Sequence, residues 1–382
     1  KYGGGIFLLV YIILALTFGY TLIMAETSLG RMTRKSPVGA FESFGNSRFI
    51  SIGGWINAII PILIVPYYSV IGGWVIKYLI EYFAGHSKTL AGDAYFTTFI
   101  SNGWSTEICF IIFTLFTLGI IYAGVRNGIE RVSKFMMPIL IVLSLIIAVY
   151  SVTRPGAIEG VKYFLVPNFD HFSWMTVVSA MGQMFYSLSI AMGILITFGS
   201  YMKKDTSIEK STENVEIFDT AIAIMAGLMI IPAVFAFSGG NAETLKSGPA
   251  LMFITIPKVF ANMGFGTAIG VVFFLLVLFA AVTSSIALTE SAVSTFEDEL
   301  HWSRKKSTVF MEMVMLLLGT LSCLGYGPLA NFKILGMQFL DFFDFITNSV
   351  MMPIAAIATC LLVSKVVGVD KIEEEIKKDG QV

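Results

Sequence analysis

Long runs of apolar residues alternate with short polar connections along the whole chain. A helix needs about 20 mostly apolar residues to cross roughly 30 Å of hydrocarbon, and nine runs meet this requirement. Such runs predict helices, because the strands of a membrane barrel alternate in polarity over about ten residues. The pattern therefore predicts an all-α polytopic membrane protein. The nine predicted crossings are 5–30, 52–83, 107–123, 132–152, 174–201, 214–238, 265–294, 306–325 and 341–366.

Basic residues are unevenly divided between the two sets of connections. One set, together with the segment after the last crossing, holds 17 of the 25 Lys and Arg residues, and the alternate set holds 7. Because Lys and Arg are enriched on the cytoplasmic side, we expect the first set and the C-terminus to be cytoplasmic. The N-terminus is then expected outside. Since the sequence begins at Lys1 without Met, we also expect a further helix before it.

Composition narrows the class of protein further. Of the 382 residues, 56% are hydrophobic and 13% are charged, and the net charge is -1. Soluble domains carry about a quarter charged residues, and nucleic-acid binders carry a strong positive charge, so both classes are excluded. Cys109, Cys323 and Cys360 lie in separate apolar runs and predict neither a disulfide framework nor a metal site.

Ionisable side chains inside apolar runs are functional candidates, because they are costly in a bilayer. Five acids in the predicted crossings stand out, namely Glu26, Asp219, Glu290, Glu312 and Asp344. For Glu26 and Glu312, a hydrogen bond between helices is the favoured interpretation. Asp219 and Asp344 fit either a structural or a functional role.

One helical face of crossing 265–294 carries hydroxyls beside small residues. Ala280, Thr283, Ser284, Ala287 and Leu288 share this face by helical spacing. Helix packing is the commoner cause of such a face in membranes. A site for a hard cation, which takes oxygen ligands, is the alternative.

Two further crossings carry polar groups at mid-depth. Ser187 and Ser189 are two residues apart, so they cannot share a helical face, and Gly193 follows. This pattern fits an interrupted helix lining a midplane site and, equally, an ordinary helix with a packing glycine. Tyr68 fits a substrate hydrogen-bond donor, although a buried tyrosine with a partner is the simpler interpretation.

Four motifs together resemble those of the bacterial amino-acid transporter branch of the neurotransmitter:sodium symporter family. They are Lys1-Tyr2-Gly3-Gly4-Gly5, Glu26-Thr27-Ser28-Leu29-Gly30-Arg31, Gly182-Gln183-Met184-Phe185-Tyr186-Ser187-Leu188-Ser189, and Thr283-Ser284-Ser285 followed by Phe296-Glu297-Asp298-Glu299-Leu300. The resemblance runs along essentially the whole chain and implies a LeuT-type fold of two inverted five-helix repeats. The nine crossings then match family helices two to ten. The implied organisation is one transmembrane domain, 1–382, with 5–152 as the remainder of the first repeat, 174–366 as the second and 367–382 as a cytoplasmic tail.

The resemblance also implies a substrate site. Tyr68 matches the tyrosine that hydrogen-bonds the substrate carboxylate, Ile64 the pocket wall one turn away, and Tyr186 the aromatic lid. The other implied substrate positions are Ser187, Ser189, Ala191, Met192, Ser284 and Leu288.

Two sodium sites are implied by the same match. Ser187 and Asp219, with the substrate carboxylate, match the first site, and Ala280, Thr283 and Ser284 match the second. Chloride-dependent relatives have Asn where this chain has Asp219, and a fixed carboxylate supplies the negative charge that chloride would bring. We therefore expect one or two sodium ions and no requirement for chloride.

Gate residues are implied likewise. Asp344, with Gln183 nearby, matches the outer gate, and Tyr201 with Asp298 matches the inner gate. The arginine partners of both gates, and the first-helix ligands of both sodium sites, would lie in the segment expected before Lys1.

The implied function is symport of sodium with a neutral, hydrophobic or aromatic L-amino acid by alternating access in the cell membrane. The expected partners are the amino acid and the bilayer, with no nucleic acid, and the oligomeric state is left open. A regulatory homologue that binds both ligands without transport is the alternative. The sequence shows neither the continuous polar stripe of a channel nor the matched base and nucleophile of an enzyme.

Overall fold

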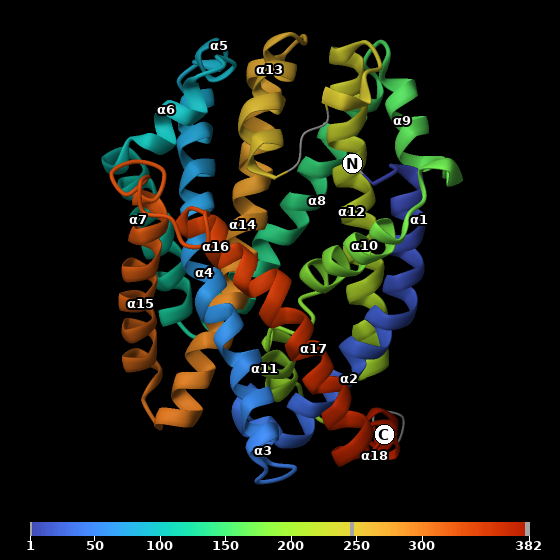
Figure 1. The fold of residues 1–382 in the computed structure, drawn as a ribbon, viewed down its shortest axis with the longest axis vertical. Helices are drawn as coiled ribbons and strands as arrows, with labels where there is room; N and C mark the ends of the chain where they lie inside the picture. Colours follow the sequence, from blue (N-terminus) through green and yellow to red (C-terminus); the bar gives the residue numbers. More distant parts are fainter. Residues whose placement is uncertain (1, 245–247, 379–382) are drawn as a thin grey trace.

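The computed structural model describes residues 2–244 and 248–378 (Figure 1). Within these ranges the chain forms helices and irregular connections, with two isolated backbone bridges, Gly4 with Pro167 and Ile334 with Met337. The predicted all-α architecture is confirmed. In chain order the helices are α1 (Gly5–Leu14), α2 (Tyr20–Thr33), α3 (Pro37–Glu42), α4 (Arg48–Phe83), α5 (Ser87–Leu90), α6 (Tyr95–Ser101), α7 (Gly103–Tyr122), α8 (Arg131–Val152), α9 (Ala157–Leu165), α10 (Trp174–Ser187), α11 (Ile194–Tyr201), α12 (Ile208–Ser238), α13 (Ile256–Ala261), α14 (Gly266–Leu300), α15 (Arg304–Leu324), α16 (Phe339–Asp344), α17 (Met352–Leu361) and α18 (Val369–Lys377).

Eight helical stretches in the described ranges are long and apolar enough to cross a membrane, and each overlaps one predicted crossing. Some contain a π-helical turn, such as Ala15–Gly19 between α1 and α2. The remaining predicted crossing, 174–201, is split into α10 and α11. The eight continuous stretches are Gly5–Thr33, Arg48–Phe83, Gly103–Tyr122, Val125–Val152, Ile208–Ser238, Gly266–Leu300, Arg304–Leu324 and Phe339–Val367.

Figure 1 shows how the helices are arranged in the bundle. Helices α4 and α14 pack together in the centre, with α7 and α15 on one side and α1, α2 and α12 on the other. Helices α16 and α17 run obliquely across the front. Helices α3 and α18 and the turn between α14 and α15 lie at the lower end, so connections predicted to be cytoplasmic gather there.

Small residues allow α2 and α11 to approach closely. A Cβ atom added at Gly30 would lie 2.0 Å from the carbonyl oxygen of Ile196, and one added at Gly199 would lie 2.4 Å from that of Thr27. Such backbone contact is typical of small residues at helix interfaces in membranes. This contact holds α11, the second half of the split crossing, against α2.

Helix α18 closes the lower end of the bundle. The buried side chain of Arg31 donates from Nε to Glu375 Oε1 at 2.8 Å and from Nη2 to the Glu375 carbonyl oxygen at 2.5 Å. It also donates from Nη1 to the Thr206 carbonyl oxygen at 2.7 Å. Burial opposes ionisation of Glu375, but hydrogen bonds from Lys378 and Arg31 outweigh it and lower the pKa of this carboxyl. Three distant segments are thereby held together.

The backbone between α10 and α11 departs from helix at 188–193. Ser189, Ala191 and Gly193 have φ angles of 57°, 60° and 74°, a region that residues with a side chain seldom adopt. The amide of Ala191 donates to Glu26 Oε1 at 2.9 Å, and Glu26 is fully buried. An amide freed in hydrocarbon needs an acceptor within the protein. The predicted interruption is confirmed. Glu26 does join two distant segments by a hydrogen bond, but its partner is a backbone amide in the break and not, as predicted, a group on another helix.

Replacing Glu26 tests this bond. Glu26→Ala would leave the Ala191 amide buried without its acceptor, so we expect the free energy of unfolding to fall by about 1–3 kcal/mol. The measurement is the unfolding temperature of the detergent-purified protein. Glu26→Gln keeps a carbonyl oxygen at this position and is the matched control, with a smaller expected loss. An unfolding temperature unchanged by Glu26→Ala would contradict this role.

Candidate functional site

A cavity of about 470 Å³ lies where the break between α10 and α11 faces α4, α8, α12 and α14. Stretches far apart in the sequence therefore contribute to a single space. Its lining residues are Ile64, Tyr68, Met137, Gln183, Tyr186, Ser187, Ser189, Met192, Ile194, Asp219, Thr283, Ser284, Ala287 and Leu288.

Eight of the nine predicted substrate positions lie in this lining. The exception is Ala191, which is fully buried at the turn of the backbone. Met137, Ile194 and Ala287 line the cavity although they were not predicted as site residues. The helical spacing did place Ala287 on the face of Thr283, whereas an apolar residue within an apolar run, such as Met137, carries no signal.

Asp219 on α12 accepts two hydrogen bonds at the cavity. Ser187, the last residue of α10, donates from Oγ to Oδ1 at 2.7 Å, and Tyr11 on α1 donates from its hydroxyl to Oδ2 at 2.9 Å. Both donors are neutral, so they orient the carboxylate without compensating its charge. Carboxylate and hydroxyl oxygens suit a hard cation. The structure thus brings together the predicted protein ligands of the first sodium site and adds Tyr11 beside them.

The three residues predicted for the second ion site lie together on α14. Thr283 Oγ1 donates to the carbonyl oxygens of Ala280 and Phe279, both at 3.0 Å. Ser284 lies beside Tyr68, and both residues line the cavity. Thr283 and Ser284 line the cavity, whereas Ala280 lies outside its lining. Among the described residues no three His, Cys, Asp or Glu side chains gather into a metal site, so a cation at α14 would depend on these neutral oxygens.

The predicted outer-gate residues occupy separate positions. Asp344, at the end of α16, is exposed and accepts hydrogen bonds from the Tyr67 hydroxyl at 3.2 Å and from Asn348 Nδ2 at 2.5 Å. Gln183 lines the cavity, whereas Asp344 does not. Tyr67 and Asn348 are partners that the sequence did not reveal. The gate role of Asp344 stays a prediction.

The predicted inner-gate residues also contact different neighbours. Asp298 Oδ2 accepts a hydrogen bond from the backbone amide of Ser36 at 2.5 Å, which ties α14 to the turn before α3. Tyr201 donates from its hydroxyl to Glu290 Oε1 at 2.6 Å. Their joint role as a gate stays a prediction.

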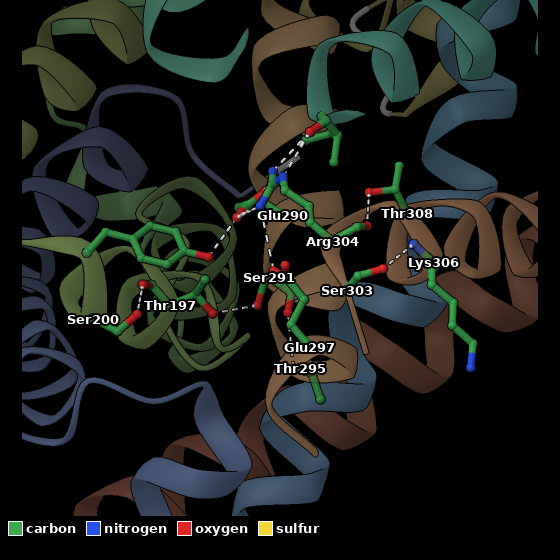
Figure 2. Close-up of polar contacts among 12 residues, drawn as sticks. Thr197, Ser200, Glu290, Ser291, Thr295, Glu297, Ser303, Arg304, Lys306 and Thr308 are labelled. Carbon is green, nitrogen blue, oxygen red and sulfur yellow. Dashed lines mark hydrogen bonds and ion pairs between the residues drawn. The ribbon is translucent and has the colours of Figure 1, made fainter. Parts of the chain in front are cut away.

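Figure 2 shows the network around Glu290, a fully buried acid of α14. Arg304 donates to its carboxylate from Nη1 at 3.0 Å and from Nη2 at 2.6 Å, and also donates to the carbonyl oxygen of Ile121. Glu297 lies 3.6 Å from the same guanidinium. A carboxylate buried in a membrane needs such a partner. The sequence marked Glu290 as a candidate but did not identify Arg304, because the two lie on different helices.

Comparison with known sequences identifies relatives along the whole chain. The family model described as "Sodium:neurotransmitter symporter family" matches residues 1–110 and 95–380. The sodium-dependent transporter YhdH of Bacillus subtilis is 33% identical, over 94% of this chain and 80% of its own. The sodium-dependent dopamine transporter of Bos taurus is 24% identical, over 88% of this chain and 55% of its own.

Comparison with solved structures agrees with these sequence relatives. The crystal structure of MhsT in complex with L-phenylalanine matches with a TM-score of 0.88 and 33% identity, covering 99% of this chain and 86% of that one. The predicted LeuT-type fold is thereby confirmed. The chain belongs to the sodium:neurotransmitter symporter family, whose members are membrane transporters and not enzymes.

Proposed function

We propose that this protein moves a neutral, hydrophobic or aromatic L-amino acid across the cell membrane together with sodium ions, by alternating access. The observation that carries the proposal is the cavity, which joins the Tyr68 hydroxyl, the broken helix and the Asp219 carboxylate with apolar side chains in one space. Sodium dependence in the names of relatives and L-phenylalanine in MhsT support it.

Each part of an amino acid has a complementary group here. Its carboxylate can accept a hydrogen bond from Tyr68 and complete the shell of a sodium ion held by Ser187 and Asp219. Its ammonium group can meet backbone carbonyls freed at 188–193, as at other broken helices. Among the described residues, no Lys, Arg or His lines the cavity, which favours an uncharged side chain. The apolar lining comprises Ile64, Met137, Met192, Ile194, Ala287 and Leu288.

Coupling between ion and substrate follows from their shared contact. If the substrate carboxylate is a ligand of the first sodium ion, each raises the affinity for the other by the same factor. An inward sodium ion also gains about 2.3 kcal/mol per 100 mV of membrane potential. One or two ions per substrate are therefore sufficient to drive accumulation of a zwitterion.

Binding of labelled L-phenylalanine to the complete protein, with and without sodium, tests the proposal. We expect sodium-dependent binding, and we expect Tyr68→Phe to weaken it by about tenfold or more, because a hydrogen bond to a charged group is lost. Tyr122→Phe is the control, because it removes the hydroxyl of a half-exposed tyrosine at the end of α7. Absence of sodium-dependent binding would contradict the proposal. Binding without uptake into proteoliposomes would favour the regulatory alternative.

Chloride replacement tests the role of the Asp219 charge. Because this fixed carboxylate supplies negative charge beside the proposed ion, we expect sodium-driven uptake to be unchanged when gluconate replaces chloride. Asp219→Asn removes that charge, so its sodium-dependent binding should be lost in gluconate and retained, at least in part, in chloride, which can supply the missing negative charge. A several-fold fall in uptake by the unchanged protein without chloride would reject chloride independence.

Competition tests the chemistry of the side-chain pocket. Burying a large apolar side chain is worth about 1.5–3 kcal/mol, so Leu, Phe and Trp should displace labelled substrate at concentrations about tenfold or more below those of Gly or GABA. Leu288→Ala should reduce this preference, because it removes an apolar part of the lining. A clear preference for Gly or GABA would contradict the hydrophobic assignment.

A further inference from the structure

Glu216 on α12 is a buried acid that the proposed substrate and ion sites do not use. It lies three residues before Asp219 on the same helical face, and its exposed fraction is 4%. Its Oε1 atom has no hydrogen-bond partner in the described part of the chain, and the charged neighbour acting on it is Asp219. Two neighbouring carboxylates inside a membrane are costly unless a cation joins them or one of them binds a proton.

A π-helical turn and two tyrosines lie near this carboxylate. A Cβ atom added at Gly19 would lie 3.5 Å from Glu216 Oε1, so the carboxylate faces the π-helical turn Ala15–Gly19 where that turn has no side chain. The hydroxyls of Tyr11 and Tyr20 lie close enough to interact with Glu216 electrostatically. π-helical turns are frequent at functional sites. Carboxylate and phenol oxygens are suitable ligands for a hard cation.

Further acids continue from Glu216 toward the end of α12 predicted to be cytoplasmic. Glu213 and Glu209 precede it by three and seven residues, which is helical spacing for one face. Both are exposed, and both lie near Tyr20. The acidic face therefore leads from the exposed start of α12 to the buried Glu216 and on to Asp219.

We propose that Glu216 is a second station for the transported sodium ion, between Asp219 and the cytoplasmic end of α12. This inference rests on the proposed sodium symport. In the release step the ion leaves Ser187 and Asp219, is held by the Glu216 carboxylate, and then passes Glu213 into water. An ion moves readily through a protein when several sites of moderate strength replace one strong site, and Glu216 would provide such an intermediate site.

Net uptake and exchange separate this role from a merely structural one. Net uptake into proteoliposomes of low internal sodium needs release of the ion in every cycle, whereas exchange of substrate with saturating sodium on both sides does not. We expect Glu216→Gln to reduce net uptake by about tenfold, because the ion loses one charge-assisted contact in the release step. Exchange and equilibrium sodium-dependent binding should stay at the level of the unchanged protein.

Two more variants complete the design. Glu216→Asp keeps a carboxylate and should retain part of the net uptake. Glu312→Gln neutralises another acid within a spanning helix, α15, outside the cavity lining, and should leave net uptake unchanged.

The outcomes distinguish this inference from the function on which it rests. Equal losses of binding, exchange and net uptake in Glu216→Gln would overturn it in favour of a structural role. Unchanged net uptake would overturn it as well, and in both cases sodium-driven uptake by the unchanged protein leaves the symport proposal intact. If the unchanged protein shows no sodium-driven uptake, the symport proposal fails, and this inference fails with it.

Discussion

The hydrogen bond from the Ala191 amide to the Glu26 carboxylate is the contact on which the geometry of the site depends. Hydrocarbon offers no water, so a helix can be broken at mid-depth only where the protein itself supplies the missing acceptors. Glu26 comes from another crossing, and it reaches the break because Gly30 and Gly199 let α2 and α11 approach backbone to backbone. The close packing of this helix pair and the polar groups at the cavity are therefore consequences of one constraint.

Buried acids receive two different electrostatic environments in this bundle. Glu290 is compensated by the guanidinium of Arg304 and held by Tyr201, so its charge is committed to the protein. Within the described ranges, Asp219 receives hydrogen bonds from neutral hydroxyls only, and Glu216 has an oxygen with no partner. A carboxylate without a fixed cation can take up a mobile one and give it back, which one neutralised by an arginine cannot do. The same side-chain chemistry thus serves rigidity on α14 and, in the proposed function, ion exchange on α12.

The sequence predicted the spanning architecture because hydrophobic length is a local property. The predicted ends fell short, as at 214–238 against Ile208–Ser238, because a helix continues through polar residues beyond the hydrocarbon. The pattern around Ser187 and Ser189 fitted a break and an ordinary helix equally well, and the family resemblance is what predicted the break and most of the cavity lining. Which residues form hydrogen bonds with each other could not be predicted. Glu26 and Ala191, for example, are 165 positions apart and come together only through tertiary packing. Met137 was missed because an apolar residue facing a cavity has the same sequence pattern as one facing lipid.

The pairing of Arg31 with Glu375 joins positions 344 residues apart, and this separation has a consequence for biosynthesis. Chains are elongated at about 5–20 residues per second, so the acceptors on α18 are synthesised on the order of tens of seconds after Arg31. Throughout that interval the guanidinium lacks the carboxylate of Glu375, so part of it must stay hydrated, because burying an uncompensated charge is costly. The first crossing can therefore enter the bilayer early, but its basic end reaches its final buried position only after α18 has left the ribosome.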